Sequence, residues 1–467
     1  MRQPLLPSAL AAVALCACVD ATVIGGDQFD DERLPVTFTD TVALTLSTER
    51  APAATLATAL RGDGVPGAYA GCLASGLTGA TTATLGLELV EEAAPRLDLG
   101  AVRVDSMVLV LPLAPALAVG DTTAAVGLRV EAAAAGSIRL AEATFADSLS
   151  GTGITYGTFA GVPAREPVVV EATVGSTVLT DTVTPQLRIR LNAAFEADVA
   201  EALRRRSPAD TVPDDSLFVG AFPGILLRGG DCSRQLPAVS LAVADAPQFG
   251  VSIYYTRDTA RGIYRLVNRR LTEQGNAFAA GTTQARVAYG HDYAGSTADT
   301  LLAGGSGRET AAAVQGLQGL NIAVGFPDIS TFGDRRGVTF AELLLPVAPS
   351  APTPVTPSER LVLRVRNASG DLIPYSADPR ASGSGGFSTS EGGLLERIPD
   401  PRGGGDSVAA YRFNITSLFQ EFVSGEREPV VFVTPLATEL VAGESALVGP
   451  DGDGLRASLR VASAELP

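Results

Sequence analysis

The stretch that decides the fold lies at residues 102–111 and reads VRVDSMVLVL. Polar and apolar residues alternate at its start, and its last five residues are all apolar. Alternation with a period of two is typical of a β-strand with one solvated face, and a short apolar run bounded by turn residues is typical of a buried strand. Pro112 and Pro115 follow the run. The stretch therefore predicts an inner strand of a β-sandwich.

The rest of the chain favours β structure as well. It contains 50 Gly and 30 Pro but no Trp, and this dense turn chemistry leaves little room for long helices. Helical periodicity appears only at residues 192–206, 310–320 and 416–423. Further strands are expected at residues 36–39, 125–132, 167–173, 186–191, 217–227, 251–256, 262–267, 341–347, 360–366, 408–415, 429–434 and 455–461. The sequence predicts a mainly all-β fold with a few short helices.

Two parts of the chain resemble each other. Residues 104–115 end LVLPLAP, and residues 338–349 end LLLPVAP. Downstream, residues 187–195 and 411–419 each read as a strand that leads into a short helix, which places Phe195 and Phe419 at equivalent positions. Asn192 and Thr416 are the expected N-cap residues of these helices. Chance similarity between strings of common residues is the alternative. Otherwise the chain is a tandem duplication of jelly-roll-like β-sandwiches, expected at residues 35–260 and 261–467.

The N-terminus predicts a lipoprotein signal. A basic start is followed by an apolar run, and residues 15–18 read LCAC. Cys18 fits acylation better than Cys16, because the small Ala17 precedes it whereas the bulky Leu15 precedes Cys16. A plain cleaved signal peptide is the alternative. We expect residues 1–17 to be removed, Cys18 to carry lipid, and the acidic residues 18–34 to form a tether to the membrane.

Charge and apolar runs exclude several classes of protein. The net charge is −16, and all 35 basic residues are Arg. Without a basic patch the chain has no means of displacing phosphate counterions, so nucleic-acid partners are not expected. Beyond the signal, the longest apolar run covers residues 107–119 and is too short to cross a bilayer. We expect no cofactor.

Two cysteines remain after the signal, Cys72 and Cys232. In an oxidising envelope compartment they would close a loop that contributes about 4–5 kcal/mol through chain entropy. Two independent buried thiols are the alternative. If the bridge forms, the two Cα atoms must lie within about 7 Å.

The residues for catalysis are sparse. His291 is the single histidine, so a His-rich zinc site is not available, and a Ser-His-Asp triad would have to use it beside Asp292. No glycine-flanked serine lies between a strand and a helix as a nucleophile requires. A polar turn in which the imidazole bonds neighbouring backbone is the better interpretation. The DGDG at residues 451–454 lacks EF-hand spacing, which favours a turn over a metal site.

The order of several short motifs resembles domain of unknown function 4270. These motifs are VDSMVL at 104–109, LNAAF at 191–195, FVGAFPGI at 218–225, SIYY at 252–255, HDYAG at 291–295, QGLQGL at 315–320, AEL at 341–343 and YRFNIT at 411–416. The resemblance implies a large lipoprotein of the Bacteroidota outer membrane with no established catalytic activity. Some members look like accessory subunits of outer-membrane barrel assembly, which implies an outer-membrane protein partner. The chain lacks the dense acidic run after the cysteine that often accompanies surface export.

Asp followed by Ser or Thr recurs along the chain and resembles the O-glycosylation signal of envelope proteins in Bacteroidota. The candidate acceptors in polar segments are Thr211, Ser216, Thr300 and Ser407. Asp-Ser and Asp-Thr are also good turn residues at strand edges, which is the alternative interpretation.

These observations give three hypotheses for function. The first is a non-catalytic, lipid-anchored outer-membrane lipoprotein, at the cell surface rather than the periplasmic face, that acts as an interaction scaffold. The second is a glycan-binding module, for which exposed aromatic rings are required. With no Trp, that platform would come from Tyr254, Tyr255, Tyr264, Tyr289 and Tyr293. A hydrolase is the third.

Overall fold

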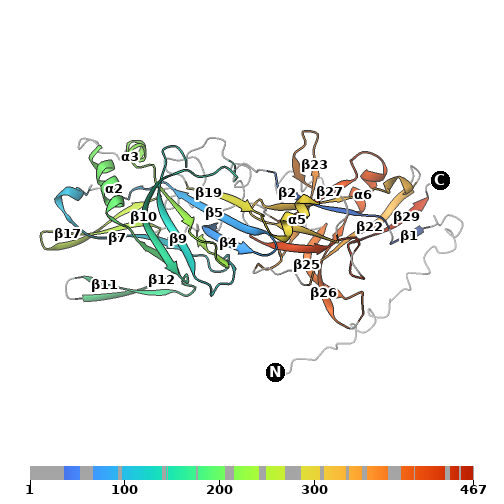
Figure 1. Ribbon diagram of the computed structural model, residues 1–467, viewed down its shortest axis with the longest axis horizontal. Helices are drawn as coiled ribbons and strands as arrows, with labels where there is room; N and C mark the ends of the chain where they lie inside the picture. Colours follow the sequence, from blue (N-terminus) through green and yellow to red (C-terminus); the bar gives the residue numbers. More distant parts are fainter. Residues whose placement is uncertain are drawn as a thin grey trace, which may run out of the picture.

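The structure is a computed structural model, and its strands form several sheets, which confirms the predicted all-β class (Figure 1). Four short helices accompany the strands in the part of the chain that the structure describes: α2 (Ala193–Arg205), α3 (Asp215–Ala221), α5 (Thr297–Ala303) and α6 (Thr416–Val423). The described residues are 36–40, 42–52, 67–92, 97–138, 144, 146–174, 177–205, 215–240, 249–268, 285–304, 310–332, 336–349, 355–376, 391–403, 405–436, 442–451 and 454–465.

The first of two bodies, called the N-terminal body, consists of the described residues between 67 and 292. Its two main sheets have the strand orders β13-β7-β17-β18-β6 and β10-β9-β14-β5-β19, with β4 also paired to β5. The strands are β4 (Gly71–Ser75), β5 (Gly79–Leu87), β6 (Val90–Glu91), β7 (Arg103–Pro112), β9 (Val126–Ala133), β10 (Gly151–Gly161), β13 (Gln186–Arg190), β14 (Ile225–Gly229), β17 (Gly250–Arg257), β18 (Ala260–Val267) and β19 (Ala285–Asp292).

The second, called the C-terminal body, consists of the described residues 36–52 and 311–465. Its sheets have the orders β1-β29-β22-β26-β25 and β24-β23-β27-β21-β20-β28, with β2 also paired to β21. The strands are β1 (Val36–Thr39), β2 (Thr45–Arg50), β20 (Ala311–Gln315), β21 (Leu320–Gly325), β22 (Arg336–Pro346), β23 (Leu361–Arg366), β24 (Leu372–Pro374), β25 (Gly392–Pro399), β26 (Ser407–Asn414), β27 (Val430–Pro435), β28 (Glu444–Val448) and β29 (Ser458–Glu465).

Shorter pairings complete the N-terminal body. Two ribbons pair β3 (Gly67–Tyr69) with β16 (Ala238–Ser240) and β8 (Val119–Gly120) with β15 (Gln235–Leu236). The hairpin of β11 (Val168–Val174) and β12 (Thr177–Val183) pairs only with itself and is drawn at the lower left of Figure 1.

The two bodies share one architecture. The strand order β13-β7-β17-β18 of the N-terminal body corresponds to β26-β22-β29-β1 of the C-terminal body. Pro112 ends β7 and Pro346 ends β22, in separate sheets, as the repeat predicts. Phe195 and Phe419, both fully buried, lie in separate hydrophobic cores. Burying such a ring contributes about 1.5–3 kcal/mol.

The correspondence extends to irregular details of the backbone. A β-bulge inserts Asp105 into β7 opposite β17, and another inserts Thr339 into β22 opposite β29. Just before each helix, the Leu191 N–H donates to the Met107 carbonyl and the Ile415 N–H donates to the Ala341 carbonyl, each at 2.9 Å. Because a bulge is a local feature that families retain, equivalent bulges support a duplication.

The strand pairing corrects the expected domain boundaries of 35–260 and 261–467. β1 pairs with β29 and β2 pairs with β21, so the N-terminal strands belong to the C-terminal body. β18 and β19 pair with β17 and β5, so residues beyond 260 complete the N-terminal body. β1 and β2 thus complete the sheets of the C-terminal body, and β18 and β19 complete those of the N-terminal body. An alternating sequence pattern does not reveal which sheet edge a strand will join.

Three local predictions need correction. Residues 310–320, expected as a helix, form β20, a turn and β21, and Leu317 and Gln318 occupy the turn with φ of 52° and 60°. Residues 217–227, expected as a strand, form most of α3 and the start of β14. Thr416 is not a helix cap, since α6 begins there and the Thr416 N–H donates to Asn414 Oδ1 at 3.1 Å. Small and apolar runs lack the period that separates helix from strand.

A buried polar junction joins the two bodies. The Gln315 amide donates to Thr78 Oγ1 at 3.0 Å and to Thr81 Oγ1 at 2.8 Å. The hydroxyls of Ser75 and Thr78 donate to the two carboxylate oxygens of Glu444, which is 2% exposed. These contacts tie the β4–β5 turn of one body to β20 and β28 of the other. Buried polar groups that satisfy one another in this way fix a single relative arrangement.

Candidate functional site

The candidate site is an open groove of about 530 Å³ in the N-terminal body. One wall is the first half of β7, and the opposite wall is the middle of β10. The end of β13 and the start of α2 form the third side. The lining residues, called the groove residues, are Val104–Met107, Thr155–Thr158, Arg190–Ala193 and Glu196. This volume lies within the range of sites that bind small ligands or peptide segments.

The groove exists because β7 is longer than the strand beside it. β13 pairs with β7 only at residues 108–112, whereas β17 pairs along residues 103–110 on the other side. Residues 103–107 of β7 therefore have a strand partner on one side only. Unpaired main-chain groups at such an edge are available to another strand.

Helix α2 is held against β10 rather than β7. Asn192 Oδ1 accepts from the N–H groups of Ala194 and Phe195 at 3.0 and 3.4 Å, which confirms the predicted N-cap. The Asn192 amide donates to the Thr155 carbonyl at 2.8 Å, and its N–H donates to the Tyr156 carbonyl, also at 2.8 Å. These bonds keep the helix on the β10 side, so the edge of β7 stays uncovered.

The equivalent edge in the C-terminal body is covered. There, Gln420 Oε1 accepts from the Val338 N–H at 2.7 Å, and Thr416 Oγ1 accepts from the Ala341 N–H at 2.9 Å. Both side chains belong to α6, which packs along β22. In the N-terminal body the positions of Thr416 and Gln420 are occupied by Asn192 and Glu196, and the described residues show no bond from either side chain to β7.

The charges of the groove are mixed. Asp105 accepts from the Thr256 hydroxyl at 2.6 Å and pairs with Arg103 at 2.9 Å, and these contacts lower the pKa of Asp105. Glu196 is half-buried and Arg190 is exposed, and among the described residues neither has an ion-pair partner. The groove can therefore accept a cation at Glu196 and an anion at Arg190, beside a row of main-chain donors.

His291 lies in the junction, away from the groove. Its Nε2 is 2.9 Å from the Leu317 carbonyl, and its Nδ1 is 3.3 Å from Thr81 Oγ1. An imidazole that donates through Nε2 accepts through Nδ1, so both ring nitrogens are satisfied by the fold. The neighbouring Asp292 carboxylate accepts from the Ala294 N–H at 3.1 Å. The imidazole does bond backbone, but that of a distant turn, and no catalytic triad is assembled around it in the described residues.

No group of three or more His, Cys, Asp or Glu side chains that could hold a metal ion occurs among the described residues. In the same part of the chain, none of the helices has the length and apolar character needed to cross a membrane.

Cys72 and Cys232 form a disulfide with Cα atoms 4.4 Å apart, within the separation expected for the predicted bridge. Cys72 lies on β4, and the Ser233 N–H donates to the Cys72 carbonyl at 2.9 Å. The bridge therefore fastens the segment before β15 to the sheet that contains β4. Cys18 lies outside the described residues, so its acylation stays a prediction.

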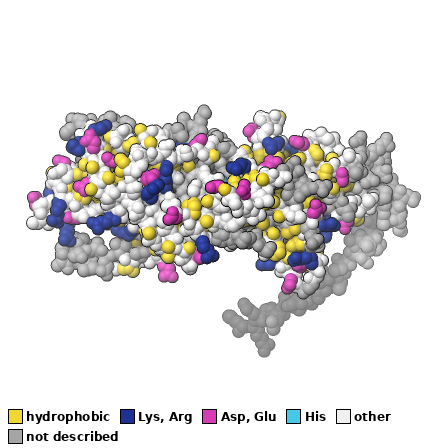
Figure 2. Space-filling model, in the orientation of Figure 1, with side chains coloured by type: hydrophobic (Ala, Val, Ile, Leu, Met, Phe, Trp, Pro, Cys, Tyr) yellow, Lys and Arg dark blue, Asp and Glu magenta, His cyan; other side chains and the backbone are white. Residues whose placement is uncertain are grey.

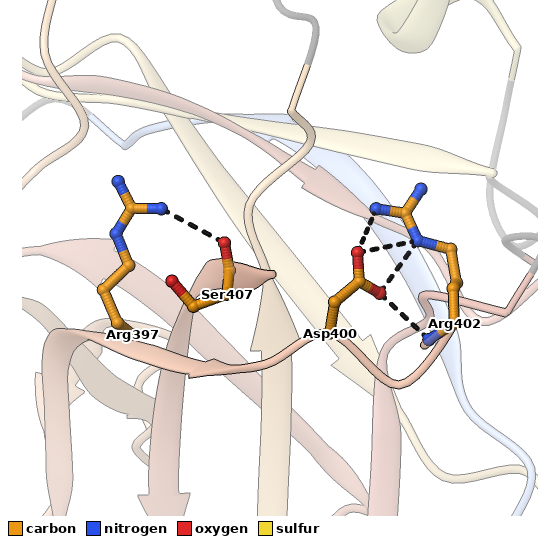
Figure 3. A network of polar contacts seen from close by, with 4 residues as sticks. All are labelled: Arg397, Asp400, Arg402 and Ser407. Carbon is orange, nitrogen blue, oxygen red and sulfur yellow. Dashed lines mark hydrogen bonds and ion pairs between the residues drawn. The ribbon is translucent and has the colours of Figure 1, made fainter. Parts of the chain in front are cut away.

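The predicted glycosylation acceptors occupy different settings. Thr300 is exposed on α5, and Ser407 is exposed at the start of β26. Arg397 donates to the Ser407 main-chain carbonyl at 3.3 Å, as Figure 3 shows, and the described residues give the Ser407 hydroxyl no hydrogen bond. In the same turn Arg402 pairs with Asp400 at 2.6 Å. Ser216 lies on α3, where its side chain is not described, and Thr211 lies outside the described residues.

The tyrosines proposed as a glycan platform are mostly covered. Tyr264, Tyr289 and Tyr293 are buried, with exposed fractions of 8%, 6% and 4%. Tyr254 and Tyr255 are half-buried on β17. Because stacking on sugars requires an open ring face, this arrangement weakens the hypothesis of glycan binding.

Comparison with known proteins adds no relative. No family model matches the chain, and no curated protein matches it. The resemblance to domain of unknown function 4270 therefore stays a prediction. The fold and groove themselves define an all-β protein of two joined sandwiches in which residues 103–107 of β7 form an open strand edge.

Two of the groove residues belong to patterns that the sequence shows, although neither pattern indicates a groove. Asp105 appeared in the Asp-Ser/Thr pattern and Asn192 as a helix cap, but Glu196 and residues 155–158 were missed. A signal was present in the repeat: Asn192 and Glu196 align with Thr416 and Gln420. A difference in chemistry at aligned positions marks where the two bodies diverge.

Proposed function

We propose that the chain is a lipid-anchored outer-membrane lipoprotein that acts as a non-catalytic interaction scaffold, with an outer-membrane protein as its partner. The single observation that carries the proposal is the way the two bodies are joined. Two exchanged strand pairs and the buried junction make the pair of sandwiches one rigid unit. Such a unit can hold a partner at a fixed distance from its anchor.

A second observation supports the anchor. Val36, Phe38 and Phe340 are 48%, 79% and 39% exposed, and Phe38 and Phe340 both pair with Ala462 of the strand between them. This apolar patch lies where the chain continues toward Cys18. The 17 residues between Cys18 and Val36 can span at most roughly 60 Å, so a bilayer that holds an acylated Cys18 lies within that distance of the patch.

The surface chemistry agrees with this role. Arg side chains and acidic side chains are interspersed on the face shown in Figure 2, and a mixed surface of this kind disfavours nucleic acid.

The experiment replaces the predicted lipidation site. Cys18→Ser is expected to move the protein from the membrane fraction to the soluble envelope fraction, while Cys16→Ser leaves it in the membrane fraction. Mass spectrometry of the N-terminal peptide should show acyl chains on Cys18 alone. A Cys18→Ser protein that still sediments with membranes and keeps its acyl mass would contradict the anchor.

A further inference from the structure

We infer that the groove of the N-terminal body binds an extended segment of a partner polypeptide, which adds a strand to the open edge of β7 at residues 103–107. The inference deepens the proposed scaffold role, on which it rests, by naming the class of partner and the place where it binds.

The internal repeat supplies the first step of the argument. Val104 and Met107 correspond to Val338 and Ala341, whose N–H groups donate to the side chains of Gln420 and Thr416. Equivalent bulges and equivalent bonds to the helix start place the two strands in the same orientation. The N–H groups of Val104 and Met107 therefore point into the groove, where the C-terminal body supplies acceptors from α6.

The second step concerns what fits there. The groove offers main-chain donors and acceptors along one wall, and an extended peptide satisfies these groups in register. The opposite wall is β10, the outermost strand of its sheet, so the occupant would lie between two strand edges. A folded helix does not present main-chain groups to such a wall.

The third step separates peptide from glycan. The groove has one aromatic residue, Tyr156, which is 2% exposed, and its hydroxyl donates to Asp198 at 2.6 Å. Sugar recognition by stacking has no platform here. Glu196, half-buried and without an ion-pair partner among the described residues, favours a segment that carries a basic side chain, and its preference outweighs that of Arg190, whose exposed charge is screened by solvent.

The experiment uses the purified full-length protein and synthetic peptides. The probe is an octapeptide of alternating threonine and valine in which two residues are arginine. One control peptide replaces alternate valines with proline, which removes N–H groups, and another replaces arginine with glutamate. Amide hydrogen exchange of residues 103–107 is expected to slow by about tenfold with the probe and to stay unchanged with the proline peptide. The glutamate peptide is expected to bind about threefold more weakly.

Two protein variants locate the binding. Thr158 lies in the groove and is exposed, whereas Ala160 lies two residues further on β10, is exposed, and does not line the groove. Thr158→Trp is expected to weaken binding of the probe by at least about tenfold, and Ala160→Trp is expected to leave it unchanged. Glu196→Gln should remove the preference for arginine over glutamate.

Several results would overturn the inference. These are no slowing of exchange in residues 103–107 by the probe, binding that survives Thr158→Trp, equal binding of the proline peptide, or protection by neutral oligosaccharides instead. The assay uses protein in solution, so it does not depend on acylation. Failure of the Cys18 experiment would remove the anchor, while failure of this one would remove the peptide groove.

Discussion

At the scale of single residues, the junction contains two titratable groups whose pKa values are shifted by burial. Desolvation raises the pKa of Glu444, and the hydroxyls of Ser75 and Thr78 partly oppose that shift. Desolvation lowers the pKa of His291, and its bond to the Leu317 carbonyl partly opposes that shift. The fold therefore favours a protonated Glu444 and a neutral His291.

The two shifts act on stability at opposite ends of the pH range. For Glu444 the folded pKa is raised, so its favourable contribution is complete below the unfolded pKa of about 4.3 and is lost as pH rises through the folded value. For His291 the folded pKa is lowered, so its contribution is complete above about 6.5 and is lost as pH falls through the folded value.

Glu444→Gln tests the first of these effects. The amide keeps the shape of the side chain but cannot ionise, so the variant is expected to be more stable than the wild type by a margin that grows between pH 4 and pH 8. Glu444→Ala, which leaves the Ser75 and Thr78 hydroxyls without this acceptor, should cost about 1–3 kcal/mol at pH 4, and this cost should shrink with rising pH by the margin that Glu444→Gln gains. Urea unfolding at pH 4, 6 and 8 measures both. A margin for Glu444→Gln that does not change with pH would show that Glu444 is not perturbed.

At the scale of elements, the equivalent helices α2 and α6 contact different strands. α6 seals the edge of β22 with its own side chains, whereas α2 is capped by Asn192 and fastened to β10. One side chain, Asn192, thus both starts the helix and sets which strand it rests on.

Asn192 variants separate these two tasks. Asn192→Ala loses both and is expected to lower the free energy of unfolding of the N-terminal body by about 1–2 kcal/mol. Asn192→Asp keeps an acceptor for the cap but loses the donor to the Thr155 carbonyl, so it should fall between the wild type and Asn192→Ala. Chemical denaturation followed by hydrogen exchange of residues 193–205 measures the effect. Equal losses in both variants would mean that the cap contributes nothing.

Local sequence patterns predicted the helices and strands better than they predicted which strands pair with one another. The strand at 103–112 and the helix at 193–205 carry clear periods. The compartment argument offered the Cys72–Cys232 bridge beside the alternative of two buried thiols, and only the structure decides between them. The hairpin at 311–325 was mistaken for a helix because Ala-rich strands carry no period of two. Edge pairing of β1 and β2 depends on which sheet edge is free in the finished fold, and no short-range pattern encodes that. The alignment of Glu196 with Gln420 marks a difference between the repeats, but the sequence does not show that Gln420 accepts from the β22 edge and that the β7 edge has no such cover among the described residues.

At the scale of the whole molecule, the chain is closed by strands far apart in sequence. Leu46 on β2 and Leu266 on β18 are both fully buried. A boundary at residue 260 would place Leu46 in the first domain and Leu266 in the second, but the structure has the opposite arrangement. Leu46 packs in the core that contains Phe419, and Leu266 packs in the core that contains Phe195. The C-terminal body thus depends on β2, which comes before the first repeat, and the N-terminal body depends on β18, which comes between the two repeats.

Core substitutions in these four positions test that arrangement. Leu46→Ala and Leu266→Ala should each cost about 2–5 kcal/mol, and Phe419→Ala and Phe195→Ala about 3–5 kcal/mol. Calorimetry should show two transitions, with Leu46→Ala and Phe419→Ala lowering one and Leu266→Ala and Phe195→Ala lowering the other. Reduction of the Cys72–Cys232 bridge should lower only the transition shared by Leu266 and Phe195, because both cysteines lie in the N-terminal body. If Leu46→Ala instead shifts the transition that Phe195→Ala shifts, β2 belongs to the first body and the exchange of strands is refuted.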